Sequence, residues 1–239
     1  MTEVRTGYMQ VALVGRLVYN GIRIGGLFMS YIPEKIRITC QELKRISVAE
    51  RVPLQTVEYC PTETYKMDNS FPADGWQPYM PGTMLAGRDR HFWFRARFSV
   101  PPGEENLAYF LQAGAGDREL WDSPDPQGLV DLNGEMIQGC DRNHTQVFLE
   151  PGKDYTLHYY FYLGMKEIRV PVKLWLCKLD IRSEQLYYDM QTALDSCLLL
   201  HENDDNRIAV LNVLEQTANR IDLRIPGSPE YYRSVEAAS

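Results

Sequence analysis

A run of polar side chains from Gly139 to His144 carries the residue types best suited to recognition chemistry. Asp141 can accept hydrogen bonds, and Arg142 can donate them in a planar fork. Asn143 and His144 can do either, so the set suits the hydroxyl groups of a sugar or the polar surface of another protein. The alternative is that these residues only fix a loop, because Asp and Asn close turns through the backbone and Arg pairs with Asp.

Four aromatic residues add a second kind of recognition chemistry, because flat rings can stack on a sugar. They are Trp76, Tyr79, Trp93 and Trp121. Aromatic residues in a β-sandwich more often fill the core, and Trp121, which has acidic residues and prolines around it, is the one we expect to be exposed. We therefore group Trp121 with residues 141–144 as a candidate carbohydrate-binding or interdomain surface.

Catalytic chemistry within this chain has weaker support. Glycoside hydrolysis needs two positioned carboxylates. The acidic residues that lie near one another in sequence are Asp122, Asp125, Asp131, Glu135 and Asp141. Acidic residues in loops are usually solvated, so we assign no catalytic residue, and a small independent hydrolase is the least favoured hypothesis.

Metal binding and nucleophilic catalysis lack their usual sequence patterns. The histidines, His91, His144, His158 and His201, show no HxH, HxxxH or HExxH spacing, and the five scattered cysteines form no CxxC pair. Neither a GxSxG elbow nor a glycine-rich phosphate loop is present. We therefore predict no metal or cofactor in this chain, and buried free thiols in a reducing compartment.

The composition is that of a globular protein, with 239 residues of which 44% are hydrophobic and 24% charged. A net charge of −7 disfavours nucleic acid as a partner, because a grip on phosphates needs an excess of Lys and Arg. The first residues lack a basic leader, and Arg16, Asn20 and Arg23 interrupt the apolar stretch that follows. The sequence therefore predicts a cytoplasmic protein with no signal peptide and no membrane partner.

Residues 54–180 have the composition of strands and turns, with frequent Pro, Gly, Thr, Tyr and Trp. Large apolar side chains alternate with polar ones in residues 91–100, which predicts a strand with one buried face. Further strands are predicted at residues 107–112, 154–162 and 168–179, the last with a break or an edge at Pro171.

One hairpin is predicted before the polar run, at Asn133-Gly134. An Asn-Gly pair between two apolar segments favours a type I′ turn, because both central residues take positive φ. Together with the short strands and their turns, the hairpin predicts a β-sandwich between residues 54 and 180.

Helical periodicity marks the two ends of the chain. Residues 1–53 form the predicted N-terminal helical segment, with its clearest helix at residues 34–50. Residues 181–239 are predicted to form a helical hairpin, with Asp180 or Ser183 as its first cap, and a third helix that begins at Ser228-Pro229. That third helix reaches the last residue without a terminator, which suggests a chain cut before its natural end.

Five segments occur in a specific order. They are Trp76-Gln-Pro-Tyr79, Pro81-Gly82, Arg88-Asp-Arg-His-Phe-Trp-Phe-Arg95, Gly128-Leu-Val-Asp-Leu-Asn-Gly-Glu135 with Gly139-Cys-Asp-Arg-Asn-His144, and Leu186-Tyr-Tyr-Asp189. The ordered set resembles the N-terminal region of α-mannosidases of glycoside hydrolase family 38, of the long, cytosolic type. The resemblance covers residue 34 to the end, and residues 1–33 match no motif.

The resemblance implies a galactose-binding-like jelly-roll β-sandwich, flanked by helices that lead to a catalytic domain. Enzymes of this family are retaining, zinc-dependent exo-mannosidases, and zinc is therefore expected in the catalytic domain, whose HxHxD motif has no counterpart here. The implied function is a non-catalytic domain, inactive alone, that docks onto and shapes the catalytic domain of the same polypeptide. Mannose-containing glycans are the implied further partners. The alternatives are an autonomous carbohydrate-binding module and the small hydrolase.

Overall fold

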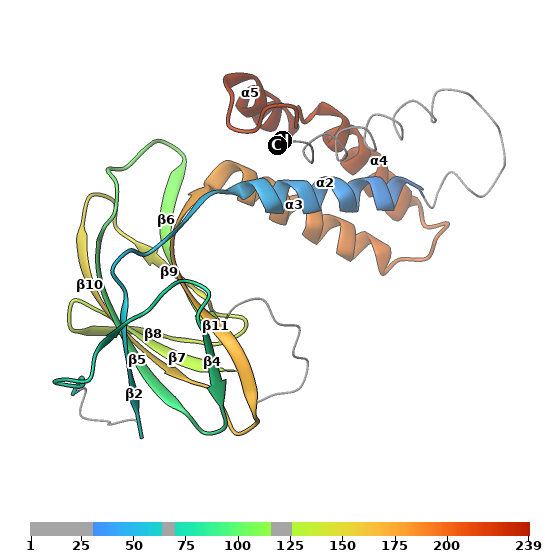
Figure 1. Ribbon diagram of the computed structural model, residues 1–239. Helices are drawn as coiled ribbons and strands as arrows, with labels where there is room; N and C mark the ends of the chain where they lie inside the picture. The colour runs from blue at the N-terminus through green and yellow to red at the C-terminus, as the bar shows by residue number, and fades with distance from the viewer. Residues whose placement is uncertain (1–30, 64–69, 116–125) are drawn as a thin grey trace, which may run out of the picture.

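The computed structural model describes residues 31–63, 70–115 and 126–239. It shows a β-sandwich with a group of helices at one end (Figure 1). This confirms the prediction of a mainly β protein in which a sandwich is flanked by helices. In chain order the elements are α2 (Tyr31–Ser47), β1 (Val48–Pro53), β2 (Glu58–Thr62), β3 (Gln77–Pro78), β4 (Met84–Gly87), β5 (His91–Ser99), β6 (Leu107–Ala115), β7 (Gln127–Leu132), β8 (Glu135–Cys140), β9 (Gln146–Leu149), β10 (Asp154–Tyr162), β11 (Ile168–Asp180), α3 (Ile181–Leu198), α4 (Asp205–Arg220) and α5 (Pro229–Ala238).

Two antiparallel sheets form the sandwich. The five-stranded sheet has the order β1-β11-β6-β9, with β4 paired to the first part of β11, and the six-stranded sheet has the order β3-β2-β5-β10-β7-β8. Pro171 is the last β11 residue paired with β4, and Val172 is the first paired with β6. The predicted break at Pro171 is therefore the point where β11 changes its partner.

The core lies between the sheets and follows from the alternation of the strands. In β5 the side chains of Phe92, Phe94 and Ala96 are buried in it, as the pattern predicted. Tyr159 and Phe161 of β10 pack beside them. Successive side chains point to opposite faces of a strand, so the residues between these positions lie on the outer face of the six-stranded sheet.

The predicted hairpin is confirmed at Asn133-Gly134, where φ is +58° and +88°. The carboxylate of Asp131 accepts a hydrogen bond from the Gly134 N–H at 3.0 Å. The Asn133 side-chain oxygen accepts one from the N–H of Thr156 in β10 at 2.8 Å. The turn is therefore fixed from within and also tied to the next strand of the sheet.

The helices form a second core with contributions from both ends of the described chain. Helix α2 packs on α3 and α4, and its Lys35 ammonium lies 3.2 Å from the carboxylate of Glu215. α2 ends at Ser47 rather than at Glu50, because the next six residues form β1 and pair with β11. Residues 48–53 of the predicted helical segment therefore belong to the sandwich.

Local cap chemistry correctly predicted where the later helices begin. Asp180 caps α3 by accepting a hydrogen bond from the Ser183 N–H at 3.1 Å, and Ser228 caps α5 with Pro229 in its first turn. The hydroxyl groups of Ser183 and Tyr231 lie 2.5 Å apart in the interior, which joins α3 to α5. The helical unit is thus held by a buried polar contact as well as by its apolar core.

Candidate functional site

The polar run from Asp141 to His144 forms the loop that leads from β8 in the six-stranded sheet to β9 in the five-stranded sheet. One oxygen of Asp141 accepts hydrogen bonds from the N–H of Asn143 at 2.7 Å, from the N–H of His144 at 2.9 Å and from the His144 ring at 2.9 Å. Burial acts to raise the pKa of Asp141, but these hydrogen bonds outweigh it and lower the pKa. Asp141 therefore fixes the loop.

The other three residues of the loop face outward. Arg142, Asn143 and His144 are exposed, and the His144 side chain has 70% of its surface accessible. The loop therefore contains both features considered from the sequence: Asp141 closes the turn through Asn143 and His144, and the side chains of Arg142, Asn143 and His144 are exposed. Trp121, which we grouped with them, lies outside the described residues.

The outer face of the six-stranded sheet carries side chains of the resembling segments together with side chains of β10, which belongs to none of those segments. We call this set the motif face, and it consists of His91, Trp93, Arg95, Asp131, His158, Tyr160 and Tyr162. At its β2 side, Arg95 donates a hydrogen bond to Glu58 at 2.7 Å and lies over the ring of Trp76 at 4.4 Å. Residues from separate segments are thus joined by an ion pair and a cation–π contact.

A second part of the motif face links histidine, tyrosine and aspartate. The His91 Nδ1 atom and the Tyr160 hydroxyl are 2.6 Å apart, and the Tyr162 hydroxyl donates to Asp89 at 3.0 Å. The rings of His91 and Tyr162 stack with centroids 4.8 Å apart. Asp89 has φ of +52°, an uncommon conformation for a residue with a side chain. The arrangement holds an exposed carboxylate beside a stacked imidazole.

The centre of the motif face is covered rather than open. Phe71 stacks on the ring of His158 with centroids 3.7 Å apart, and Trp93 is 2% exposed. Beneath Phe71, the His158 Nδ1 atom lies 3.8 Å from the buried carboxylate of Asp131 and has no hydrogen-bond partner in the described structure. Burial lowers the pKa of His158, with Asp131 acting in the opposite direction and Arg95 in the same one.

This lowered pKa predicts the pH dependence of stability. The folded state binds a proton at His158 less readily than the unfolded state, so the free energy of unfolding should be highest above about pH 6.5 and fall as the pH decreases toward the folded pKa. Urea denaturation at pH 7.5 and 5.5 measures the effect. The His158→Gln variant should lose less stability between these pH values than the wild-type chain, and an equal loss would contradict the assignment.

The scattered acidic residues have separate positions in the structure. Asp131 is buried and holds the hairpin, Asp141 holds its own loop, and Glu135 is exposed at the start of β8. Asp122 and Asp125 lie outside the described residues. In the described part of the chain, no three His, Cys, Asp or Glu side chains are grouped so as to hold a metal ion.

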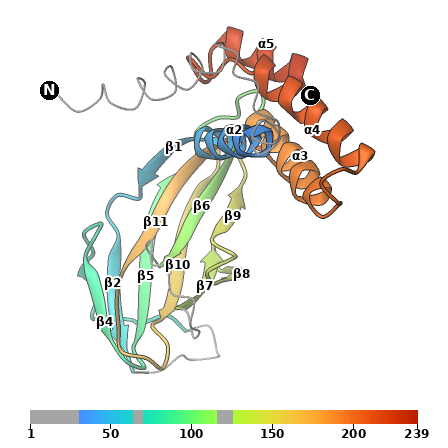
Figure 2. The same ribbon diagram turned by 90° about the vertical axis from the view of Figure 1, so that its right-hand side faces the viewer.

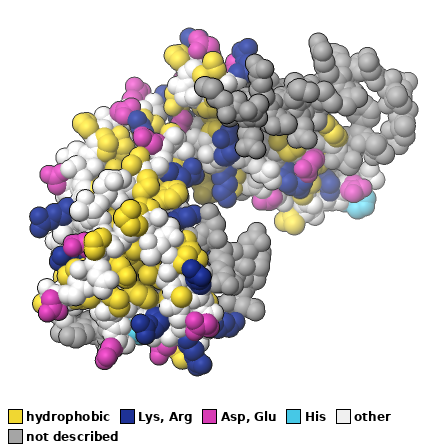
Figure 3. Space-filling model, in the orientation of Figure 1, with side chains coloured by type: hydrophobic (Ala, Val, Ile, Leu, Met, Phe, Trp, Pro, Cys, Tyr) yellow, Lys and Arg dark blue, Asp and Glu magenta, His cyan; other side chains and the backbone are white. Residues whose placement is uncertain are grey.

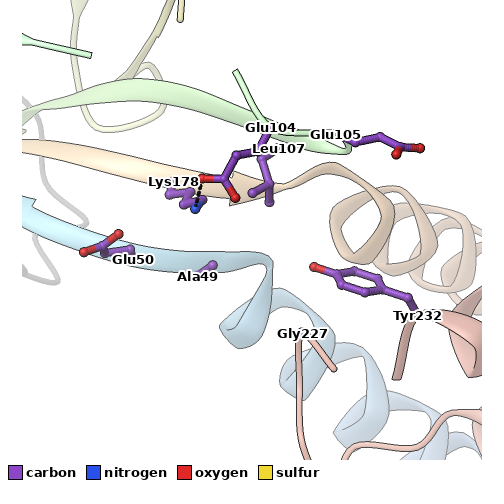
Figure 4. A pocket seen from close by; sticks show the side chains of 8 residues that line it. All are labelled: Ala49, Glu50, Glu104, Glu105, Leu107, Lys178, Gly227 and Tyr232. Atoms are coloured by element: carbon purple, nitrogen blue, oxygen red, sulfur yellow. Dashed lines mark hydrogen bonds and ion pairs between the residues drawn. The ribbon is translucent and has the colours of Figure 1, made fainter. Parts of the chain in front are cut away.

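A polar cavity of about 640 Å³ lies where the sandwich meets the helices, and sequence reasoning did not find it (Figure 4). Its lining comes from β1, β11, α5 and the segments beside them. Lys178 donates a hydrogen bond to Glu104 at 2.6 Å there, and Arg182 lies 3.9 Å from Glu105. Burial, with the neighbouring Asp180, raises the pKa of Tyr232 to about 12. The Arg182–Glu105 contact joins the two units, because Glu105 precedes β6 and Arg182 lies in α3, whereas Lys178 and Glu104 both belong to the sandwich.

The fold and the surfaces define a β-sandwich with a packed helical unit, a presented polar loop and a partly covered motif face. No helix within the described ranges has both the length and the apolar character needed to cross a bilayer.

Comparison with known proteins identifies no family for this chain. No family model and no curated protein matches the chain. Among solved structures, the CBM51-2 and INT domains of Clostridium perfringens ZmpB match at 12% identity with a TM-score of 0.18. That match covers 74% of this chain and 45% of the other. A TM-score this low carries no argument about fold or function.

Proposed function

We propose that this chain is the non-catalytic N-terminal region of a zinc-dependent α-mannosidase of glycoside hydrolase family 38, of the cytosolic type. In this proposal it docks onto the catalytic domain of the same polypeptide and helps to shape the active site. The catalytic domain holds the zinc and hydrolyses terminal α-mannosides. The role of the present chain is to help position the active site of that domain.

One observation carries the proposal: two of the ordered segments that resemble this family, residues 76–79 and 88–95, contact each other at the six-stranded sheet. Trp76 of the first segment lies under Arg95 of the third, and the rings of Tyr79 and Phe94 meet edge to face with centroids 5.1 Å apart. The two parts of the fourth segment form β7 and β8 of the same sheet, where Gly128 pairs with Cys140. These contacts support the view that the first, third and fourth segments belong to one structural unit, whereas Leu186–Asp189 lies in α3.

The loop after β8 supplies the docking groups in this proposal. Asp141 fixes the backbone through three hydrogen bonds, so Arg142 and His144 are held outward. Arginine is enriched among the residues that dominate binding at interfaces. A fixed loop loses little conformational freedom on docking, and that favours binding.

Substitution in the full-length polypeptide tests this role. Arg142→Ala or His144→Ala should leave the melting temperature unchanged and lower kcat/KM on a nitrophenyl α-mannoside by about tenfold, the factor given by 1.4 kcal/mol. Arg97→Ala, which removes an exposed arginine from β5, is the matched control and should have no effect. Unchanged activity in both loop variants would leave the loop with a structural role only.

The exposed side chains of Arg142, Asn143 and His144 also favour the second candidate, an autonomous carbohydrate-binding module. Titration of the chain with mannose and mannobiosides, followed by NMR, distinguishes the two. The docking proposal expects no saturable shifts in the loop, whereas shifts confined to residues 141–144 would support sugar binding by this chain alone.

A further inference from the structure

The outer face of the five-stranded sheet has an apolar part, formed by β6, β9 and the second half of β11, where a solvent-facing sheet is normally polar. Its outward side chains come from alternate positions of four strands: Arg51 and Pro53 of β1, Arg169, Lys173, Trp175, Cys177 and Leu179 of β11, Ala108, Phe110 and Gln112 of β6, and Gln146 and Phe148 of β9. The inward residues of β11, such as Val172 and Leu174, already fill the core. A sheet that is apolar on both faces is typically covered on both.

Half of this outer face is covered and half is not. Phe110, Cys177 and Leu179 are buried in a small cluster of their own beside the helices. Phe148 continues that cluster, with its ring centroid 6.1 Å from that of Phe110, yet it remains 62% exposed. The apolar surface therefore runs without a break from a buried interface onto an accessible one.

The charge of this face differs from that of the whole chain. Arg51 and Arg169 are exposed on it, and the Lys173 ammonium lies 5.4 Å from the centroid of the Trp175 ring. No Asp or Glu occupies an outward position within β1, β4, β6, β9 or β11, whereas the chain has 32 acidic and 25 basic residues. The outward positions of the described strands in the accessible half thus combine basic and aromatic side chains without carboxylates.

This composition is typical of the centre of a protein–protein interface, where aromatic residues, Met and Arg are enriched and Asp and Glu are depleted. The position of the face also suits a folded partner. Figure 2 shows β1, β11, β6 and β9 running up to the helices, and Figure 3 shows the molecule hollowed at the angle between sandwich and helices, with Lys and Arg side chains along it.

We infer that the outer face of the five-stranded sheet binds an acidic protein surface with an apolar centre. The identity of this partner rests on the proposed function: it is the catalytic domain of the same polypeptide. Phe148 and Trp175 fill the apolar centre, and Arg51 and Arg169 pair with carboxylates around it. The face would then be a second docking contact beside the loop at residues 141–144, which leads directly into β9.

Thiol labelling tests this inference, because all five native cysteines are buried and give little background. Gln146→Cys places a reporter on the face next to Phe148, and Arg97→Cys places a control on the exposed outer side of the six-stranded sheet. Labelling by a maleimide is measured in the 239-residue chain and in the full-length polypeptide. At position 146, the full-length polypeptide should react at least about tenfold more slowly than the 239-residue chain, the factor that about 1.4 kcal/mol of docking free energy gives. At position 97, the two polypeptides should react at the same rate.

Reversal of one charge on the face gives a second test of the inference. Arg169→Glu, added to the Gln146→Cys reporter in the full-length polypeptide, should restore the labelling rate, whereas equal rates with and without this substitution would contradict an acidic partner.

Equal labelling of position 146 in both polypeptides overturns the inference. Protection that rises with the concentration of the isolated chain also overturns it, because the occupant is then a second copy. Protection in a full-length polypeptide without α-mannosidase activity would instead refute the proposed function and leave this surface assignment standing.

Discussion

Gly128→Ala should lower the free energy of unfolding by about 3 kcal/mol or more, because the strand position has no room for a side chain. An added Cβ would lie 2.4 Å from both the Cε2 and the hydroxyl oxygen of Tyr159. Tyr159 is fully buried between the sheets, so its ring cannot move out of the way. The effect is steric, since Gly128 has no left-handed φ that alanine would resist.

Urea denaturation of Gly128→Ala beside Gly139→Ala measures this effect. Gly139 lies on the neighbouring strand β8, where an added Cβ would meet its nearest atom at 3.8 Å, so this control should be close to neutral. Adding Tyr159→Leu should recover part of the stability lost in Gly128→Ala. Equal destabilisation by the two glycine substitutions would show that the contact with Tyr159 is not the cause.

Leu43→Ala should lower the free energy of unfolding by about 2–5 kcal/mol, the usual cost of a buried leucine truncated to alanine. Leu43 is completely buried in the core that α2 shares with α3, α4 and α5. Ile38→Ala on the same helix is the matched control, because Ile38 is 49% exposed and its truncation removes little buried surface. A small effect at Leu43 would show that α2 does not belong to this core.

The same denaturation reports whether sandwich and helices unfold together. Trp76, Trp93 and Trp175 belong to the sandwich, and Trp121 lies outside the described residues, so fluorescence of a Trp121→Phe background follows the sandwich while far-ultraviolet circular dichroism follows the helices. The contacts of Arg182 with Glu105 and of α2 with β1 predict coincident transitions in the wild-type chain. Leu43→Ala should separate them, with the dichroism transition first.

Elements set by local chemistry were predictable from the sequence. The alternation in residues 91–100 and the aromatic run in residues 154–162 correspond to β5 and β10, and the side chains of Asp180 and Ser228 cap helices as expected. The short stretch Val48–Pro53 gave no such signal, because its strand exists only by pairing with β11, more than a hundred residues later in the chain. For the same reason, the packing of α2 on the C-terminal helices was not foreseen.

The candidate surfaces were also predictable only where local sequence determines them. The residue types in the loop at residues 141–144 were compatible with a recognition role and with a turn-fixing role. The structure shows that Asp141 fixes the turn and that Arg142, Asn143 and His144 are exposed. The stack of Phe71 on His158 and the burial of Asp131 depend on three separate segments meeting. The apolar outer face of the five-stranded sheet had a partial signal in the continuous run Leu174–Leu179, which lacks the polar alternation of a half-exposed strand.

Two neighbouring docking contacts, the loop at residues 141–144 and the outer face of the five-stranded sheet, give the proposed role a physical basis. Polar groups on a rigid loop supply orientation, and an apolar face with arginines around it supplies buried area. Together they would hold a catalytic domain more firmly than either contact alone.

The most direct measurement is α-mannosidase activity on a nitrophenyl α-mannoside, compared between this 239-residue chain and the polypeptide encoded by the whole reading frame. The proposal predicts activity in the full-length polypeptide that a zinc chelator abolishes, and none in this chain. Activity in this chain alone, or a full-length polypeptide that has no such activity, would contradict it.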